Sequence, residues 1–390
     1  MKKIIFCDIN RHPKRIDFNI VDINDTTNEK YDIFFEFDFE NQPSDIALSL
    51  AFCSMIKEYD EVYIDLPLPE ELTTYLSSGL KAKVNCKSYI PPFSIQQNTS
   101  GNTMLLFSGG VDSVAAKILL PNTTKLISFD YGDQYSREYK IIKKFQTNVI
   151  HTNFRNTKFF KKMEKLHPPA FGIGSLLLCE HFSSFHVATG DILEASHDFN
   201  CYITHQVVPS SYIGMRQVRP TLGLTEFGTA KIVYNTYKDS PQLISEIIES
   251  VAPVGAVKRY RKELLLTFYG ATIEIHPVKN LEWGQDYVFD FLSLYMYKHH
   301  NSHIKERLQK HIPKEVVDFI NTHDLDFYEK VNPKTLISIN SNNNINFYLK
   351  MLFKNGISLY TPKDFGELYD VRNILASYYS EINNHIKLLS

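Results

Sequence analysis

Met104-Leu105-Leu106-Phe107-Ser108-Gly109-Gly110-Val111-Asp112-Ser113 is the stretch that decides the fold this sequence predicts. It joins a short, wholly apolar run to a pair of glycines, and a helical pattern follows from 111 to about 120. Such an apolar run is typical of a strand in the middle of a parallel sheet. We therefore expect a strand, a tight loop and a helix in succession, with the loop at the positive end of the helix dipole.

The loop from Ser108 to Ser113, Val111 included, has the composition of an anion-binding site. Gly109 and Gly110 allow backbone conformations closed to other residues and leave room for a phosphate. The backbone amides at the start of the helix would then face the anion, helped by the two serine hydroxyls. Asp112 would repel phosphate unless Mg²⁺ lay between them, so it predicts a metal-bridged pyrophosphate. The simpler alternative is a turn in which Asp112 caps a helix.

The same spacing argues against a Walker-type loop, because no Gly-Lys-Ser or Gly-Lys-Thr is present to place a lysine at the γ-phosphate. A loop that holds pyrophosphate suits chemistry at the α-phosphate. In such chemistry an acceptor oxygen attacks, AMP is transferred and pyrophosphate leaves. ATP and Mg²⁺ are therefore the expected cofactors.

Strand-like and helix-like patterns alternate after the loop. Strands are predicted at 126–130, 148–152 and 186–191, with a helix at 136–145 between the first two. This alternation predicts an α/β fold with a doubly wound parallel sheet of the Rossmann type.

Three domains are predicted. Residues 1–98 hold further strand patterns and a helix from Ser44 to Tyr59 and form a small α/β domain; 103–285 form the nucleotide domain; 286–390 form a helical region. A linker rich in proline, glutamine and asparagine separates the first two.

Composition indicates an ordinary globular protein. Of the 390 residues, 43% are apolar and 22% charged, and the net charge is −2, so no global positive field draws the chain to nucleic acid. Local basic clusters, one at 158–165 and one at 258–262, are interpreted as solvated faces.

The five cysteines include no C-x-x-C pair, which excludes a zinc knuckle and suits reduced thiols in a cytosol. The apolar run at the N-terminus is too short for a signal peptide, and no stretch approaches the ~20 apolar residues of a membrane span. A cytoplasmic protein is expected, with no membrane partner.

Two further segments extend the pattern: Phe129-Asp130-Tyr131-Gly132-Asp133-Gln134-Tyr135-Ser136-Arg137-Glu138 and Leu224-Thr225-Glu226-Phe227-Gly228-Thr229-Ala230-Lys231-Ile232-Val233. With the loop at 108–113, they resemble the PP-loop ATP pyrophosphatase superfamily, whose signature is S-G-G-x-D-S. The first segment is similar to the F-D-Y-G-Q-x-x-x-x-E of the 7-cyano-7-deazaguanine synthases within it. The likeness spans residues 103 to about 260.

The resemblance implies an enzyme that adenylates a deazaguanine carboxylate and passes it to ammonia. It implies that Ser108, Gly109, Gly110, Asp112 and Ser113 hold pyrophosphate and Mg²⁺. It also implies that Phe129, Asp130 and Tyr131 line the adenosine side. The chain departs from the family by lacking its zinc knuckle, for which the helical C-terminal region is the predicted replacement. It also lacks the arginine of a proline-rich loop, here His167 to Ser175.

Secondary candidates follow the fourth predicted strand of the nucleotide domain. Asp191, Glu194, His197 and Asp198 are placed to bind metal or acceptor, or else to cap and solvate a helix. Arg216 and Arg219 could neutralise a carboxylate or AMP, with a surface role as the alternative. His299, His300 and His303 could share a helical face, but no acidic partner accompanies them. Cys179 is predicted to be a core residue.

The first functional hypothesis is an ATP-dependent ligase. It would activate a carboxylate or carbonyl by adenylation and pass it to a nitrogen nucleophile, in a reaction that depends mainly on positioning and charge stabilisation. The expected partners are a small-molecule acid and ammonia or an amine donor, with a protein or RNA acceptor as an alternative. A nucleotide-binding subunit without turnover and a tRNA-modifying adenylase are the competing hypotheses.

Overall fold

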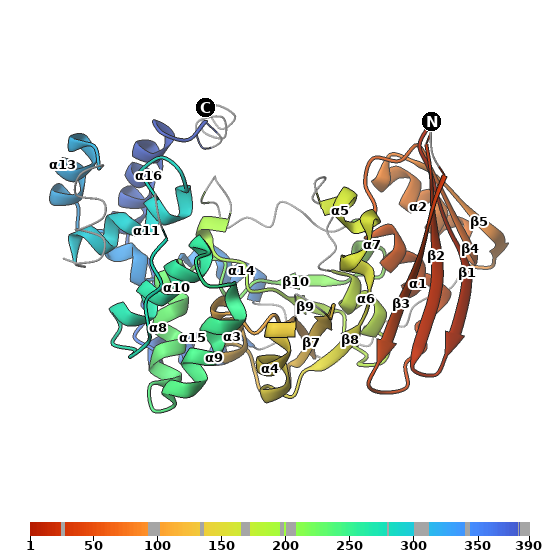
Figure 1. The fold of residues 1–390 in the computed structure, drawn as a ribbon, viewed down its shortest axis with the longest axis horizontal. Coiled ribbons are helices and arrows are strands. Elements are labelled where there is room, and N and C mark those ends of the chain that lie inside the picture. The colour runs from red at the N-terminus through yellow and green to blue at the C-terminus, as the bar shows by residue number, and fades with distance from the viewer. Residues whose placement is uncertain are drawn as a thin grey trace. The chain divides into compact units, whose positions relative to one another are not determined.

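The computed structural model shows an α/β protein (Figure 1). It describes the chain except residues 25–27, 93–101, 133–135, 165–171, 196–198, 200–207, 279–280, 300–311, 340–343, 381 and 383–390. The strands form a ten-stranded sheet in the order β10-β9-β6-β7-β8-β3-β2-β1-β4-β5. Most neighbouring pairs in it are parallel, which confirms the predicted α/β class with a largely parallel sheet.

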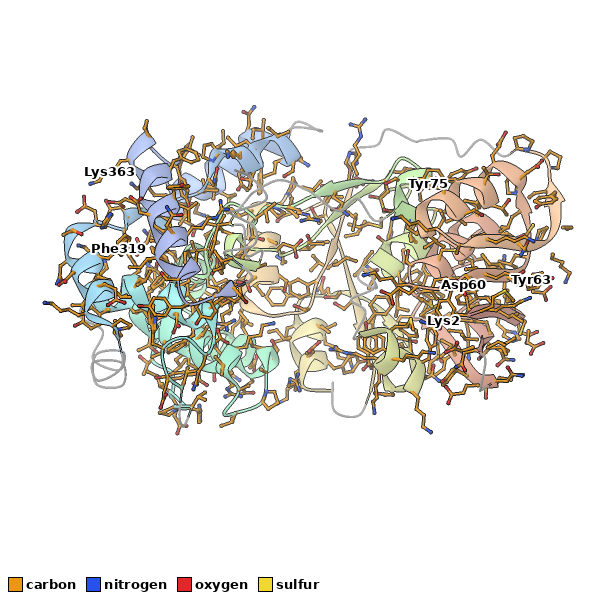
Figure 2. All side chains as sticks on the ribbon, turned by 90° about the horizontal axis from the view of Figure 1, so that it is seen from above. Lys2, Asp60, Tyr63, Tyr75, Phe319 and Lys363 are labelled. Atoms are coloured by element: carbon orange, nitrogen blue, oxygen red, sulfur yellow. The ribbon has the colours of Figure 1, made fainter. Side chains whose placement is uncertain are left out.

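The first half of the sheet comes from the N-terminal part of the chain. Its strands are β1 (Lys3–His12), β2 (Arg15–Ile23), β3 (Asn28–Phe37), β4 (Glu61–Pro69) and β5 (Lys83–Ile90). β1, β2 and β3 form an antiparallel meander, while β4 and β5 continue parallel to β1. β1 and β4 start together, with Lys3 paired to Glu61, and just before them the Lys2 amide donates to the Asp60 carboxylate at 2.6 Å (Figure 2).

Two helices belong to this half. α1 (Asp45–Cys53) begins at Ser44, whose hydroxyl accepts the Ala47 amide as an N-cap should. α2 (Glu70–Leu80) begins after Pro69, and its first turn carries two glutamates. Alternating buried residues of β1 to β4 pack with α1 into one core, in which Phe6 stacks on Phe52 at 4.7 Å between ring centroids.

The second half of the sheet is wholly parallel. Its strands are β6 (Thr103–Leu106), β7 (Lys125–Asp130), β8 (Asn148–His151), β9 (His186–Ala188) and β10 (Arg216–Val218). Numbered within this half, their order is 3-2-1-4-5, which is compatible with a Rossmann-like fold. The order reverses between β6 and β9. α4 (Ser136–Lys144), α5 (Lys158–Glu164), α6 (Ile173–Leu178) and α7 (Val208–Tyr212) lie between these strands in sequence.

The two halves meet where β3 pairs antiparallel with β8, through Glu36 with His151 and Phe37 with Ile150. The sequence patterns did not predict this junction, nor strands β5 and β10. The strands that were predicted all occur, and β6, β7 and β8 match their predicted bounds to within a residue.

The chain divides into two compact units. The sheet unit comprises residues 1–108, 122–188 and 203–218, and the helical unit comprises 109–121, 189–202 and 219–390. This division differs from the domain boundaries predicted near residues 98 and 285. Those boundaries concern domains that fold independently, and they stay a prediction. Within the described residues, no helix has the length and apolar content to cross a bilayer.

The helical unit gathers α3 (Val111–Leu119) with the helices that follow residue 219. These are α8 (Glu226–Tyr237), α9 (Pro241–Val251), α10 (Val257–Phe268), α11 (Tyr287–Lys298), α13 (Lys314–Thr322), α14 (Leu336–Ile339), α15 (Asn344–Lys354) and α16 (Pro362–Ala376). α3 packs against α8, α9 and α15. An aromatic core surrounds Tyr328, which stacks on Tyr295 at 5.1 Å and lies 4.6 Å from Phe291 between ring centroids.

Candidate phosphate-binding loop

The glycine pair after β6 joins that strand to the start of α3. Gly109 has φ +77°, in the left-handed region that favours glycine. Gly110 is the N-cap of α3 and has no side chain to cap the helix. The Ser113 hydroxyl donates to the Gly110 carbonyl at 2.9 Å, and the Ser250 hydroxyl donates to the Gly109 carbonyl at 3.2 Å. The carbonyls of both glycines are therefore hydrogen-bonded by serine hydroxyls.

Gly190 packs directly against the first turn of α3. A Cβ at this position would lie 2.9 Å from the Ser113 nitrogen and 3.0 Å from its Cα. Gly190 follows β9, and the loop at 108–113 follows β6. These are the two loops that follow the strands between which the strand order reverses, and they pack against each other. In a doubly wound sheet, ligands bind outside the carboxyl ends of the strands at this point.

Replacing Gly190 with alanine is expected to push the first turn of α3 away and to weaken phosphate binding at least tenfold. The new methyl group meets backbone atoms, which cannot rotate aside, and overpacking of this kind costs about 1–3 kcal/mol. Calorimetric titration with Mg²⁺–pyrophosphate measures the affinity. Gly366→Ala is the control, because nothing lies within 4 Å of the methyl group it adds. Equal affinities for the two variants would contradict this placement.

Asp112 is held by two partners in the helical unit. Lys262 of α10 donates to its two carboxylate oxygens at 2.7 and 2.9 Å, and the Thr229 hydroxyl of α8 donates to one of them at 2.7 Å. The Lys262 side chain is only 1% exposed. Burial alone would lower the pKa of Lys262, but the carboxylates of Asp112 and Glu226 raise it, so the lysine is a buried cation.

The charges continue away from the loop in alternating sign. Lys262 also contacts Glu226 at 3.2 Å, Arg261 bonds Glu226 at 3.1 Å, and Arg261 reaches Asp286 at 3.4 Å. Burial opposes ionisation of Glu226, but the two cations prevail and lower its pKa to about 2. Asp286 in turn caps α11 by accepting the Phe289 amide. A chain of ion pairs thus joins α3, α8, α10 and α11.

Glu194 contacts the residues of these ion pairs through Glu226. It is fully buried, one carboxylate oxygen accepts the Glu226 amide at 2.7 Å, and the other oxygen has no hydrogen-bond partner. Burial, reinforced by the Glu226 carboxylate, raises the pKa of Glu194 to about 8. The side chain is therefore a neutral acid near pH 7. It contacts the start of α8 and is not a solvated substrate contact.

The Asp112 carboxylate has room for one more contact. A carboxylate offers about four lone-pair positions, of which Lys262 and Thr229 use three among the described residues. One position on the Asp112 carboxylate remains, and the side chain is 20% exposed. Mg²⁺ commonly takes one or two carboxylates together with phosphate oxygens and water. Asp112 can supply one such contact.

The predicted adenosine segment lies in the sheet unit, at the end of β7. Phe129 stacks on Tyr131 at 5.5 Å, and the Tyr131 carbonyl accepts the Asn156 side-chain amide at 2.7 Å. The Asp130 carboxylate accepts the Gly132 amide at 2.9 Å and lies 3.1 Å from His151 Nδ1. The structure thus gathers these three residues into one ordered strand end, while Gly109 to Ser113 belong to the helical unit.

The predicted substrate residues have different surroundings. Asp191 directly follows Gly190, accepts the Thr189 hydroxyl at 2.7 Å and lies 3.6 Å from Arg219. Arg216 instead begins β10 and is exposed. Because β10 runs parallel to β9, Arg216 lies at the amino end of the sheet, away from the loops that follow the carboxyl ends. Asp191 and Arg219 belong to the same unit as the loop at 109–113, whereas Arg216 belongs to the sheet unit.

Several of the other predicted site residues lie outside the part of the chain that the structure describes. His197, Asp198, His300 and His303 lie outside the described residues, as do residues 133–135 of the F-D-Y-G segment. Among the residues that the structure describes, no group of three or more histidine, cysteine and acidic side chains could hold a metal. Cys179 is buried, which confirms its predicted core position, and burial raises the pKa of its thiol to about 12.

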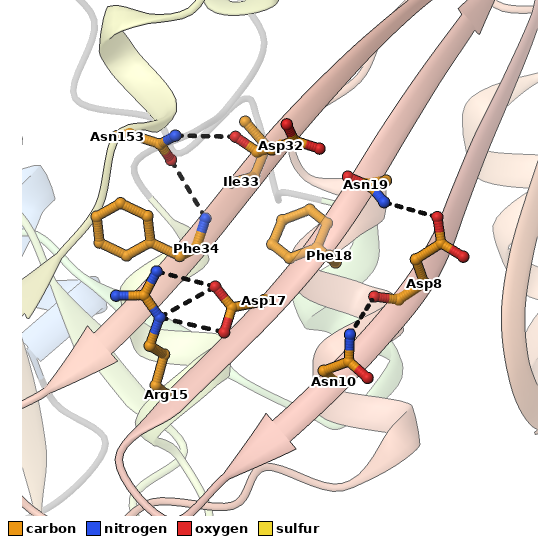
Figure 3. Close-up of a pocket in the computed structure, with 10 residues that line it drawn as sticks. All are labelled: Asp8, Asn10, Arg15, Asp17, Phe18, Asn19, Asp32, Ile33, Phe34 and Asn153. Atoms are coloured by element: carbon orange, nitrogen blue, oxygen red, sulfur yellow. Dashed lines mark hydrogen bonds and ion pairs between the residues drawn. The ribbon is translucent and has the colours of Figure 1, made fainter.

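A separate hollow of about 360 Å³ lies on the open face of the N-terminal strands (Figure 3). Polar groups dominate its lining, and the Arg15 guanidinium is already engaged by the Asp17 carboxylate at 3.0 and 3.1 Å. None of the predicted site residues lines this hollow. We therefore do not assign the phosphate site to it.

Lys262 and Arg261 are the residues that the sequence analysis placed wrongly. Their basic cluster was interpreted as a solvated face, but Arg261 is 9% and Lys262 1% exposed. Only Lys258 in this cluster keeps the predicted exposure fully. Tyr260 and Leu264 are four residues apart and mark the buried side of α10. This spacing was the one signal in the sequence that could have predicted burial of the neighbouring Arg261 and Lys262.

Comparison of the chain with protein-family models, with curated proteins and with solved structures finds no match.

Proposed function

We propose that the protein is an ATP-dependent adenylating enzyme of the PP-loop type, built on a Rossmann-type sheet. It would convert ATP to AMP and pyrophosphate to activate a carboxylate or carbonyl for a nitrogen nucleophile. One observation carries the proposal: the loop from Gly109 to Ser113 opens a helix at the point of strand reversal, with Gly190 packed against it. Two linked phosphates are the anion that such a loop and helix start suit best.

In this proposal the chain's residues position charge and do little acid–base chemistry. Ser108, Gly109, Gly110, Val111 and Ser113 hold pyrophosphate, and Asp112 adds a contact to the Mg²⁺ that the phosphates carry. Phe129, Asp130 and Tyr131 line the adenosine side. Asp191 lies beside the loop for contact with the acceptor. Mg²⁺ would neutralise charge that develops on the phosphate oxygens.

The reaction proceeds in two displacements. A carboxylate oxygen of the small-molecule acid attacks the α-phosphorus of ATP, and the bond to pyrophosphate breaks. The nitrogen of ammonia or an amine then attacks the acyl carbon, AMP leaves with the electron pair of the broken bond, and the nitrogen loses a proton to water. The products are an amide, AMP and pyrophosphate.

Replacing Ser113 with alanine is expected to lower pyrophosphate release at least tenfold, since its hydroxyl holds the Gly110 carbonyl at 2.9 Å and so fixes the loop at the helix start. The assay counts pyrophosphate and AMP from ATP, Mg²⁺, a panel of acids, and ammonia. Ser338→Ala is a matched control, because its hydroxyl also donates to a carbonyl three residues earlier, at 2.8 Å against 2.9 Å for Ser113. Release by the wild-type protein no greater than by Ser113→Ala, across the panel, would refute the proposal.

The contacts of Asp112 favour one competing function, a nucleotide-binding subunit without turnover. Lys262 and Thr229 already engage both oxygens of its carboxylate, which limits what remains for Mg²⁺. ATP binding in calorimetry together with absence of AMP formation would support this alternative. AMP formation dependent on an added acid would exclude it.

A further inference from the structure

We propose that His151 is a positioning residue for the adenosine segment, and that the N-terminal strands serve to brace it. This inference rests on the proposed function and assigns a role to the N-terminal part of the chain. His151 ends β8, beside Asp130 at the end of β7. Its two ring nitrogens lie 3.1 Å from Asp130 and 3.3 Å from Asp38, so the imidazole bridges two carboxylates.

The bridge fixes the conformation of the strand end. One Asp130 oxygen accepts the Gly132 amide and closes a turn in which Gly132 has φ +66°, while the other oxygen faces His151. The Thr152 amide donates to the Asp130 carbonyl at 2.9 Å. With both sides of Asp130 held, the direction of the next residue, Tyr131, is fixed as well.

The far end of the bridge belongs to the N-terminal strands. Asp38 directly follows β3, and β3 pairs with β8 through Glu36 opposite His151. Asn153 adds a second clamp, because its side chain donates to the Asp32 carbonyl at 2.8 Å and accepts the Phe34 amide at 3.2 Å (Figure 3). β3 is therefore attached on both sides of the strand end that carries His151.

The other groups around the bridge are an aromatic ring and charges that already have partners. The Tyr139 ring lies edge-on at 6.2 Å, and Lys143 lies over that ring at 4.4 Å; the Glu36 carboxylate is paired with Arg15 at 2.8 Å. Asp38 and Asp130 are thus the two carboxylates that contact the ring nitrogens of His151.

The experiment separates adenosine binding from phosphate binding in the full chain. Affinities for Mg²⁺–ATP, AMP and Mg²⁺–pyrophosphate are measured by calorimetry. His151→Gln is expected to weaken ATP and AMP binding by about tenfold, and pyrophosphate binding should stay unchanged. Asp38→Asn keeps an acceptor and removes the charge of a carboxylate that is 61% exposed, so it should fold normally and weaken AMP binding by about threefold.

His323→Gln is the matched control, since His323 also pairs with an aspartate, Asp370, at 3.6 Å in the helical unit. A parallel loss of ATP and pyrophosphate affinity in His151→Gln would show a general structural defect and overturn the inference. Unchanged AMP affinity in both His151→Gln and Asp38→Asn would overturn it too, while leaving the proposed function intact. Failure of the wild-type protein to bind ATP at all would remove the proposed function, and the inference with it.

Discussion

Replacing Lys262 with methionine is expected to destabilise the helical unit by about 3–5 kcal/mol, the cost of removing one partner from a buried ion pair. Methionine fills a similar volume but leaves Asp112 and Glu226 without the cation that lies within 3.2 Å of both. Both carboxylates then remain poorly solvated. Among the described residues, Glu226 retains Arg261 as its cationic partner. The first turn of α3 is expected to loosen, because Asp112 keeps only Thr229 as a partner.

The chain offers a selective probe for this effect. Its single tryptophan is Trp283, which lies in the helical unit with its ring edge-on to Tyr378 at 5.7 Å. Urea unfolding followed by tryptophan fluorescence therefore reports on that unit. Lys231→Met is the matched control, since Lys231 pairs with Glu329 at 2.6 Å but remains 21% exposed, and breaking a pair that water can still reach costs less than breaking a buried one. Equal losses in the two variants would contradict the assigned role of Lys262.

A double substitution tests whether the loss comes from the Asp112 contact itself. Asp112→Asn combined with Lys262→Met removes the stranded charge on α3, so the double variant should recover part of the stability lost in Lys262→Met. If phosphate binding depends on the orientation of α3, the affinity for Mg²⁺–pyrophosphate should fall in both variants. If the double variant regains stability but not affinity for Mg²⁺–pyrophosphate, the effect on folding is separate from the effect on binding.

The sequence predicted the parts of the fold that local patterns determine. The strand at 103–106, the loop and α3 follow from an apolar run, two glycines and a helical pattern, and Ser44 caps α1 as expected. β5 was missed because its exposed face is mostly polar and charged, as is usual for an edge strand. β10 has three residues, too few for periodicity to be seen.

The candidate site was predicted less completely, because its contacts are distant in sequence. Lys262 is 150 positions from Asp112, and Thr229 is 117 positions from it. A single sequence records the residue types but not the pairing, so a lysine on α10 is interpreted as solvated unless its carboxylate partner is known. The junction of β3 with β8 was missed for the same reason, since a ladder of only two residue pairs joins segments that are distant in sequence.

Replacing Glu194 with glutamine is expected to flatten the pH dependence of stability between pH 6 and 8. Burial, with the Glu226 carboxylate, raises the pKa of Glu194 to about 8 from an ordinary value of 4.5. The folded state therefore keeps a proton that the unfolded chain releases. The stability it contributes is complete below about pH 4.5 and is lost as pH rises through 8, at about 1.4 kcal/mol per pH unit between these limits.

Glutamine reproduces the neutral acid at every pH, because its carbonyl can accept the Glu226 amide as Glu194 does at 2.7 Å. The variant should match the wild-type protein near pH 5 and exceed it in unfolding free energy by about 4 kcal/mol near pH 8. Asp290, whose pKa burial raises to about 7, contributes in the same direction in both proteins, so it cancels in their difference. Urea titrations of the Trp283 signal at pH 5, 6, 7 and 8 measure that difference. A constant difference across this range would show that Glu194 stays ionised in the folded protein, against the neutral acid that its burial beside Glu226 implies.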